Sequence, residues 1–516
     1  MMNQMKIYNY YLILFLAFIS CESIYFDDPS TLTNDEAIEK IKSLGYVLTT
    51  SSVQTTFMTT TSNAGGSHFS LWADQSTNTN GSQSWWDFAN EPRMRLNNNS
   101  AYRGNAAVRD IYSKFYQANL DASKVIDMIE NQDVRIFDEE GNDRTEDCLV
   151  GSYYVKGVSQ GYLGVIFDRG IIVDDIALTT REFSHSYKDL IENGISHLDH
   201  TLQLIEDHPN IKFDFLSGVV VSQDQLVKLI NSMAARILSS VARDKHEAEG
   251  LGDTHWNRVL SYANKGFDED FLITTVPGGY YNALITALER LSGSAGHVPV
   301  DIKIPYLADK NGSTPNYYPV DNSIILEPIE TDDKRFYDYF TYTTNFGILL
   351  EARGRGLFSN YMRNRWVAPE RSTLNVAGAI NPYFLKEEIR LLKAESKFWL
   401  NDYAGAAELL NASDASRIIN GELPNIPANE SALREALHYE YSIEIDGAGG
   451  TFVPFTFMRR NDLLQGGTPT QFPVPQIQLE LIGLETYTFG GIANAGERGI
   501  YGELATANDN GWKLSE

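Results

Sequence analysis

Cysteine is scarce in this sequence, with two residues among 516, Cys21 and Cys148. A chain of this size can bury a large core and does not need disulfides for stability. If Cys21 is used for another purpose, Cys148 has no partner within the chain. We then expect Cys148 to be a small residue of the core.

Long hydrophobic runs are also missing near the start of the chain. Residues 12–19 are a wholly apolar stretch of eight, whereas a membrane-spanning helix needs ~20 such residues. We therefore expect residues 1–20 to be a signal peptide that directs export and is then removed. The run Phe18-Ile19-Ser20-Cys21 resembles a bacterial lipobox, which implies cleavage before Cys21 and its acylation, for example by palmitate. The alternative is a soluble secreted protein in which Cys21 has no role.

Positive charge is in short supply. The chain has 42 Lys and Arg against 68 Asp and Glu, for a formal net charge of −26. Nucleic acid and anionic lipid surfaces are poor partners for such a chain. Linkers rich in Pro or in Gly and Ser are absent as well, so we expect residues 21–516 to form one body.

What the sequence does contain is helical periodicity. Apolar residues recur every three or four positions in several stretches, which predicts amphipathic helices. The longest stripe contains Val108, Ile111, Phe115, Ala118, Ala122, Val125 and Ile129. Others contain Tyr154, Val158, Gly161 and Val165; Ile191, Ile195, Leu198, Leu202 and Ile205; Leu226, Ile230, Met233 and Ile237; and Leu385, Ile389, Leu392, Ser396 and Trp399.

Small residues refine these predictions. Glycines at 157, 161 and 164 would weaken a helix, so we expect them to mark close helix–helix contact. Asp253 or Thr254 is predicted to cap a helix that carries Trp256 and Val259. Ala394 and Ala406 lie twelve residues apart, like the small residues of a tetratricopeptide unit, so the helices are expected to pair as degenerate helical-hairpin repeats. An ordinary all-helical domain is the alternative.

Two regions lack these stripes. Residues 50–103 are rich in Asn, Ser and Thr but contain three tryptophans, and residues 272–383 are rich in Gly, Pro, Tyr and Arg. Loops of such length are usually functional or disordered, and the aromatic content argues against disorder.

Leu437-His-Tyr-Glu440-Tyr-Ser-Ile-Glu444 carries two spaced glutamates, and Phe472-Pro-Val-Pro475 follows it. The order of these and other loose motifs resembles the SusD/RagB family of surface lipoproteins, which has a helix with two such glutamates and a near-terminal Phe-Pro-Ile-Pro. Glu387 to Glu395 and Tyr116-Gln-Ala-Asn119 resemble two earlier family helices. Tyr441, where the family usually has Arg, and Phe455-Thr-Phe, where a Trp-Asp-Leu cluster is common, depart from the pattern.

The resemblance implies a mostly α, tetratricopeptide-like helical-hairpin scaffold with long irregular loop-rich insertions. It divides the body into residues 21–103 with an aromatic loop, 104–271 with helical-hairpin repeats, 272–383 with a loop-rich ligand-binding insertion, and 384–516 with a final helix pair and C-terminal segment. It implies a lipid-anchored protein on the outer face of the outer membrane, and a SusC-type TonB-dependent transporter as partner. Oligosaccharides are the implied ligands, peptides the minority case, and no cofactor or catalysis is implied.

Glycan binding needs flat aromatic faces with amide, carboxylate and Arg groups around them, because sugar C–H faces are apolar and sugar hydroxyls need paired donors and acceptors. Residues 72–95 supply such a set, from which we select Trp72, Trp85, Trp86, Asn90 and Arg93. The alternative is that Trp85 and Trp86 pack one into the core and one against the transporter. A second set lies in the insertion, and from it we select Tyr281, Tyr317 and Tyr318; Tyr280, Tyr342, Arg363, Arg365 and Trp366 belong to the same set. Packing within loops is the alternative for these.

Signals for other chemistry are weak. His197 and His200 could lie one helical turn apart, as in zinc sites, but no third ligand is evident, and residues 138–143 lack the oxygen spacing of an EF-hand. Gly-x-Ser-x-Gly and His-Glu-x-x-His motifs are absent. A surface glycosidase and a purely structural surface component remain the alternatives to a binding protein.

Overall fold

The computed structural model describes residues 34–61, 66–78, 85–173, 183–216, 218–274, 299–315, 327–344, 359–366, 380–449, 452–508 and 511–513. These residues form a mostly helical protein, as predicted. The N-terminal helices are α2 (Asn34–Thr61), α3 (Gly66–Trp72), α4 (Trp85–Phe88), α5 (Ala106–Glu130), α6 (Thr145–Ile166), α7 (Tyr187–Asp207), α8 (Gln223–Ser239), α9 (Lys245–Gly250) and α10 (Gly252–Asn264). The later helices are α12 (Lys303–Ala308), α13 (Lys334–Tyr339), α14 (Lys386–Trp399), α15 (Tyr403–Leu410), α16 (Ser416–Ile419), α17 (Glu430–Ile443), α18 (Phe452–Arg460) and α19 (Gln476–Leu481).

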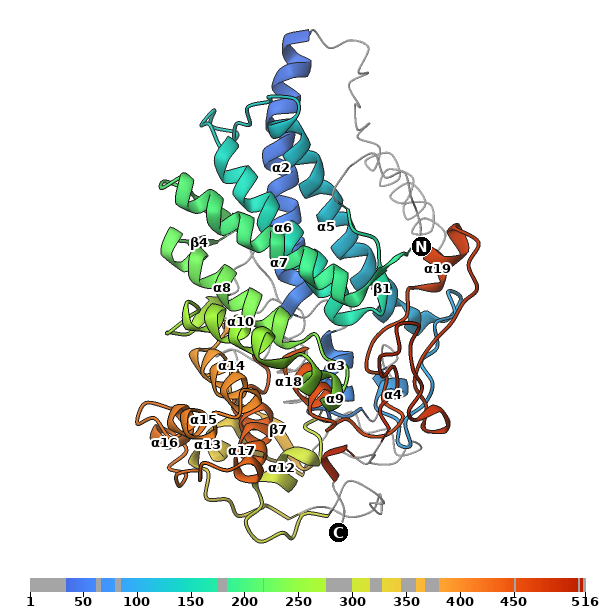
Figure 1. Cartoon of the computed structure of the whole chain (residues 1–516), viewed down its shortest axis with the longest axis vertical. Coiled ribbons are helices and arrows are strands. Elements are labelled where there is room, and N and C mark those ends of the chain that lie inside the picture. The colour runs from blue at the N-terminus through green and yellow to red at the C-terminus, as the bar shows by residue number, and fades with distance from the viewer. Residues whose placement is uncertain are drawn as a thin grey trace, which may run out of the picture.

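The long helices stack in chain order. α2 packs on α5, α5 on α6, α6 on α7, α7 on α8, and α8 on α10, which in turn packs on α14. Figure 1 shows this stack descending from the blue α2 to the orange α14, α15 and α17. The amphipathic stripes predicted from the sequence form the inner faces, with Val108, Ile191 and Leu226 each fully buried. Capping boxes begin two of the helices, α7 at Ser186 and α8 at Ser222.

One continuous core runs through this stack, from Val53 on α2 to Trp512 near the C-terminal end. Cys148 lies in it with no exposed surface, which confirms its prediction as a core residue. Burial raises the pKa of the Cys148 thiol to about 12. Among the described helices, no segment combines the length and the apolar character needed to cross a membrane.

Glycines hold α6 against α7, as predicted. A Cβ added at Gly194 of α7 would lie 2.5 Å from Gly161 N and 2.7 Å from Gly157 O, both backbone atoms of α6. A Cβ at Gly157 would lie 2.6 Å from Leu198 Cδ2. Real Cβ atoms do not approach this closely, so only glycine permits the backbone contact between these two helices.

We expect Gly194→Ala to lower the free energy of unfolding by about 3 kcal/mol, because α6 and α7 must separate to admit the methyl group. The matched control is Gly250→Ala in α9, where an added Cβ meets nothing within 4 Å. That change should stay within about 0.5 kcal/mol of the parent. Urea unfolding followed by circular dichroism measures both variants, and equal values for the two would contradict the close-contact explanation.

The predicted tetratricopeptide-like pair is present. α14 packs on α15, and Ala394 and Ala406 are both fully buried between them. Phe398 and Leu410 complete the contact, 4% and 1% exposed. The small residues twelve positions apart therefore serve the close approach of two helices, as in a helical-hairpin repeat.

Short antiparallel strand pairs connect the helical parts: β1 (Arg169–Gly170) with β2 (His185–Ser186), β3 (Phe213–Leu216) with β4 (Val219–Val221), β5 (Phe271–Thr274) with β8 (Ile380–Phe384), and β6 (Phe340–Tyr342) with β7 (Tyr361–Arg363). The β5–β8 pair joins the two ends of the predicted insertion, with Phe271 opposite Phe384. The insertion therefore leaves and rejoins the helical stack at one place.

Two details differ from the sequence analysis. α2 extends to Thr61, into the polar region that was expected to be irregular. The predicted cap of α10 was wrong: the helix begins at Gly252, so Asp253 lies inside its first turn. Asp244 instead caps the preceding α9, where its Oδ1 accepts the Glu247 N–H at 2.7 Å.

Candidate functional site

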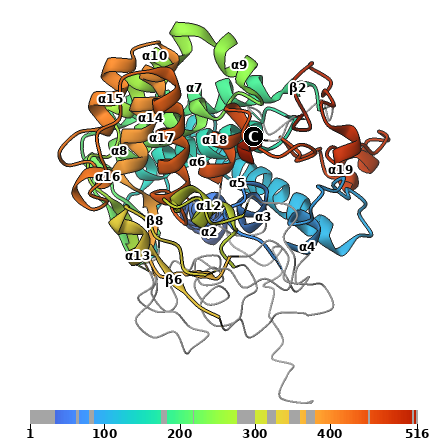
Figure 2. The same ribbon diagram turned by 90° about the horizontal axis from the view of Figure 1, so that it is seen from below.

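The two segments predicted to bind ligand meet at one junction. Ser76 pairs with Val300 in an antiparallel bridge, and Thr77 N donates to Pro299 O at 3.0 Å. Ser359, from a later part of the same insertion, donates its N–H to Val300 O at 2.9 Å. Residues 72–95 and the insertion 272–383 therefore meet in this region. In Figure 2, α3 and α12 lie near the centre of the view, with α4 and β6 below them.

A buried ion pair between Arg363 and Asp446 stabilises this junction. Arg363 of β7 binds Asp446 through Nε at 2.6 Å and Nη2 at 2.9 Å, and the same Nη2 donates to Gln75 O at 2.7 Å. Gln75 Nε2 in turn donates to Asp446 Oδ1 at 3.0 Å and to Ser442 O at 2.9 Å. Charged hydrogen bonds of this kind are strong because both partners are shielded from water. They hold the two predicted segments to the end of α17.

Arg93 has a similar positioning role. Its guanidinium pairs with Asp74 and donates through Nη1 to Phe88 O at 2.9 Å. Asp74 also accepts from Gln465 Nε2 at 2.9 Å and from Trp512 Nε1 at 2.7 Å. The Arg93 residue is 3% exposed. Its guanidinium therefore binds groups inside the protein and stabilises the conformation of residues 72–95.

The predicted tryptophans divide between core and surface. Trp72 is 3% exposed and stacks on Phe88 at 4.9 Å between ring centroids, with Phe472 at 5.2 Å on another side. Trp85 is also 3% exposed, whereas Trp86 is half-buried beside it on α4. Asn90 is half-buried, and its Nδ2 lies 2.8 Å from the Met94 sulfur.

Burial divides the predicted ligand-binding residues into two groups but does not test whether any of them binds ligand. Trp72, Trp85 and Arg93 have packing and pairing roles in this structure, and their contact with ligand stays a prediction. Trp86 and Asn90 keep part of their surface accessible to solvent. Tyr281, Tyr317, Tyr318 and the lipidation residue Cys21 lie outside the described residues.

A second aromatic feature comes from the insertion. The Arg365 guanidinium lies 4.0 Å from the Tyr339 ring centroid and 4.4 Å from that of Trp366. Trp366 has a φ of +62°, a conformation that costs energy for a residue with a Cβ. Its Nε1 is buried, and no described residue accepts a hydrogen bond from it. Strained residues are concentrated at binding sites, so Trp366 is the best candidate among those members of the predicted second set that the structure describes.

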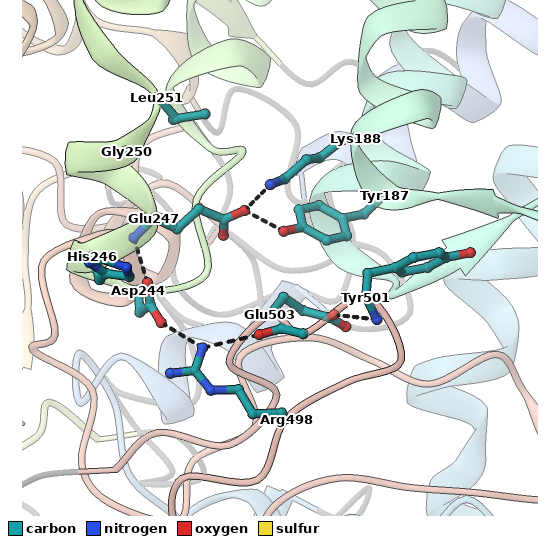
Figure 3. Close-up of a pocket in the computed structure, with 11 residues that line it drawn as sticks. Tyr187, Lys188, Asp244, His246, Glu247, Gly250, Leu251, Arg498, Tyr501 and Glu503 are labelled. Carbon is teal, nitrogen blue, oxygen red and sulfur yellow. Dashed lines mark hydrogen bonds and ion pairs between the residues drawn. The ribbon is translucent and has the colours of Figure 1, made fainter.

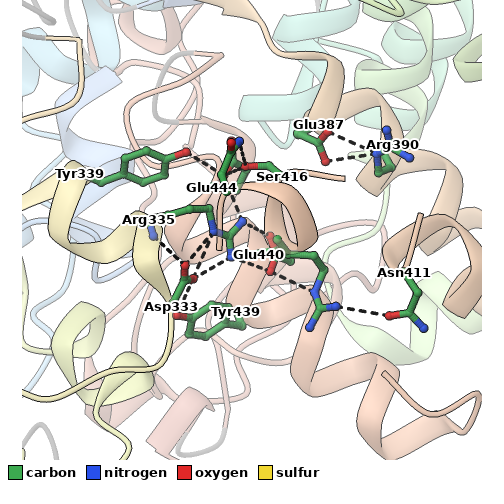
Figure 4. Close-up of polar contacts among 12 residues, drawn as sticks. Asp333, Arg335, Tyr339, Glu387, Arg390, Asn411, Ser416, Tyr439, Glu440 and Glu444 are labelled. Atoms are coloured by element: carbon green, nitrogen blue, oxygen red, sulfur yellow. Dashed lines mark hydrogen bonds and ion pairs between the residues drawn. The ribbon is translucent and has the colours of Figure 1, made fainter. Parts of the chain in front are cut away.

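Next to Arg365 lies a buried charged network (Figure 4). Arg335 of α13 pairs with Asp333 Oδ2 and Glu440 Oε2 at 2.7 Å and with Glu444 Oε2 at 3.1 Å. Glu440 lies in the last turn of α17 and Glu444 caps its C-terminal end, and these are the two glutamates of the family-like motif. The motif therefore binds the insertion to the helical stack.

The network controls the ionisation of its own carboxylates. Burial raises the pKa of Glu440, an effect that Arg335 opposes. Burial would also raise the pKa of Glu444, but the Arg365 and Arg335 guanidinium groups hold it below its ordinary value. Burial raises the pKa of the neighbouring Glu387 to about 7. Because the charges are paired internally, the network offers no net charge to a ligand.

An open pocket of about 540 Å³ lies beside the network. Its floor includes Asp333, Arg417 and Glu440. Its walls are mainly apolar and comprise Leu307, Ala308, Leu423, Pro424, Ile426, Pro427, Ala432 and Ala436. Mainly apolar walls suit a largely apolar group. The charged part of the lining has four carboxylates, Asp332, Asp333, Glu435 and Glu440, against Lys310 and Arg417.

Metal chemistry finds no support in the described part of the chain. No three His, Cys, Asp or Glu side chains there lie close enough together to hold a metal ion. His200, one of the two histidines considered above, has its ring 4.4 Å from that of Tyr153, centroid to centroid.

Solved structures with a SusD-like fold resemble this one. A SusD superfamily protein from Parabacteroides distasonis ATCC 8503 superimposes with a TM-score of 0.57 at 12% sequence identity, over 87% of this chain and 98% of that chain. A SusD homolog from Bacteroides thetaiotaomicron VPI-5482 gives 0.55 at 14% identity, over 84% and 96%. A SusD-like carbohydrate binding protein from Bacteroides vulgatus ATCC 8482 gives 0.51 at 13% identity, over 83% and 86%.

No protein-family model matches the sequence, and no curated protein matches it. The chain thus has a SusD-like fold, and the resemblance drawn from its motifs is confirmed at the level of the fold.

Proposed function

We propose that this protein captures oligosaccharides at the outer face of the outer membrane and passes them unchanged to a SusC-type TonB-dependent transporter. Lipid on Cys21 would hold it in the membrane. The observation that carries the proposal is the SusD-like fold, which extends over most of the chain. The contact between the two predicted ligand segments, which also carry the half-buried Trp86, Asn90 and Trp366, supports the choice of a glycan as ligand.

A peptide ligand is the second candidate function. The pocket of about 540 Å³ beside α17 favours it, because its apolar walls suit a side chain better than a sugar. Ala432 lines this pocket at the start of α17. Ala432→Trp would fill part of the space and provides a variant that tests this candidate separately.

We expect Trp86→Ala to weaken oligosaccharide binding about tenfold, which corresponds to about 1.4 kcal/mol. The loss of one stacking ring explains an effect of this size. Calorimetric titration with a panel of oligosaccharides measures it. Trp399→Ala is the matched control. This half-buried tryptophan at the end of α14 stacks on Trp256 of α10, and α14 lies away from α4 in both views (Figures 1 and 2).

The same titrations separate the alternatives. Retained affinity in Trp86→Ala would move the glycan site elsewhere. Binding of peptides alone, lost in Ala432→Trp, would replace the glycan proposal with the peptide one. Release of products from a polysaccharide panel by the purified protein would contradict the absence of catalysis.

A further inference from the structure

A second pocket, of about 280 Å³, lies between three segments distant in sequence (Figure 3). Tyr187 and Lys188 come from the first turn of α7, residues 244–251 from α9 and its flanks, and Arg498 and residues 501–503 from the C-terminal loops. In Figure 2, α9 lies on the side of the molecule opposite α4 and β6. The pocket is therefore separate from the junction described above.

Ion pairs between the segments form the walls in advance of any ligand. Glu247 of α9 pairs with Lys188 Nζ at 2.6 Å and accepts the Tyr187 hydroxyl, which ties α9 to α7. Asp244 Oδ2 lies 3.3 Å from Arg498 Nη1, which ties α9 to the C-terminal loop. Glu503 accepts the Tyr501 N–H at 3.0 Å. A site held in this way binds without a large cost of ordering its side chains.

The ion pairs of the pocket place hydrogen-bond donors and acceptors next to each other, and the cationic members are partly exposed. The side chains of Lys188 and Arg498 are 51% and 54% exposed, so their remaining N–H groups are accessible. Their carboxylate partners Glu247 and Asp244 are 15% and 8% exposed. Tyr501, 43% exposed, adds an aromatic ring at the edge of the pocket.

This combination selects a class of ligand. Three carboxylates against two cationic side chains oppose an anion, and the described residues include no group able to hold a metal ion. A hydroxyl group can donate to a carboxylate and accept from an ammonium or guanidinium at the same time. The ring of Tyr501 suits the apolar C–H face of a sugar. The volume is just below the usual range for small-molecule sites, which suits a single sugar ring.

We propose that this pocket is a second carbohydrate site, which binds one neutral sugar residue through Lys188, Arg498, Glu247 and Tyr501. It does not depend on the function proposed for the junction. A glycan could occupy it whether or not Trp86 contacts ligand.

Saturation-transfer NMR with methyl α-D-glucoside, methyl β-D-galactoside and methyl α-D-mannoside tests the proposal on the purified full chain. We expect at least one of these glycosides to bind, and Tyr501→Ala and Arg498→Ala to raise its dissociation constant at least tenfold. The matched control is Ile500→Ala, since Ile500 is 59% exposed next to Tyr501 but does not line the pocket. It should change the dissociation constant less than twofold, as should Trp86→Ala.

Three outcomes would overturn the second site. One is that none of the three glycosides gives a saturation-transfer signal. Another is that Tyr501→Ala and Arg498→Ala bind as well as the parent. The third is that Trp86→Ala abolishes the signal, because that result would place all binding at the junction. If Trp86→Ala lost oligosaccharide binding but still bound the glycosides at the second pocket, both proposals would be supported, as two separate sites.

Discussion

Arg335→Ala is expected to lower the free energy of unfolding by about 4 kcal/mol. The Arg335 side chain is 0% exposed and pairs with Asp333, Glu440 and Glu444. Its removal leaves buried carboxylates without their counter-charge. An unpaired buried charge destabilises the folded state by far more than an exposed ion pair stabilises it. The loss should be smaller at pH 5 than at pH 8, because the unpaired carboxylates can then take up protons. Urea unfolding at the two pH values measures both effects.

The control for this prediction is Arg109→Ala. Arg109 pairs with Asp110 at the surface, with side chains 48% and 37% exposed, so its loss should change stability by less than about 0.5 kcal/mol. Adding Glu440→Gln to Arg335→Ala should recover part of the stability, since it removes one of the stranded charges. Equal stability of Arg335→Ala and Arg109→Ala would show that the network does not hold the insertion to α17.

The helical part of the fold could be predicted because its signal is local. The stripe from Val108 to Ile129 coincides with α5, and the glycines at 157 and 161 correctly marked the contact between α6 and α7. Both signals arise from one surface of one helix. Neither depends on knowing which distant segment packs against it, so the sequence alone contains them.

α2 was missed because its residues argue against a helix. Its second half is rich in threonine, whose β-branch disfavours helices and whose hydroxyl competes for backbone hydrogen bonds. In the structure these hydroxyls bond within the helix instead: Thr49, Thr59 and Thr60 donate to the carbonyls four residues earlier at 3.0, 2.6 and 3.0 Å. Packing of Val53 and Phe57 against the core then stabilises the helix. Tertiary contacts overrode propensity.

The sequence indicated which segments could form the site, but not which of their side chains are exposed. Trp85 and Trp86 are adjacent, yet one is 3% exposed and the other half-buried, and a helix as short as α4 has no periodicity that would tell them apart. The glutamates of the motif on α17 were identified, but their partner Arg335 precedes Glu440 by 105 residues. Pairings over such distances are not visible in one sequence. The pocket of about 280 Å³ between α7, α9 and the C-terminal loops was missed for the same reason.

Asp168→Asn is expected to stabilise the protein at pH 8 and to remove part of its pH dependence. Asp168 is fully buried between β1 and the C-terminal segment, where the Tyr487 hydroxyl lies 2.8 Å from its Oδ2. Burial raises its pKa from 3.8 to about 7, although Tyr487 and Arg169 oppose the shift. Between pH 4 and 7 the folded state therefore keeps a proton that the unfolded state has lost. Stability must fall as pH rises through this window and level off above it.

The size of this effect follows from the shift. Each unit of pKa is worth 1.36 kcal/mol, so the parent should lose on the order of 4 kcal/mol between pH 4 and pH 8 through Asp168. Asparagine resembles the neutral acid and can still accept from Tyr487, so the variant should lack that loss. Glu387, with its pKa also raised to about 7, contributes a similar slope to both proteins, which leaves Asp168 as the difference. Urea unfolding of the pair from pH 4 to 8 measures it. If the variant lost as much stability from pH 4 to pH 8 as the parent does, the pKa of Asp168 would not be raised in the folded protein.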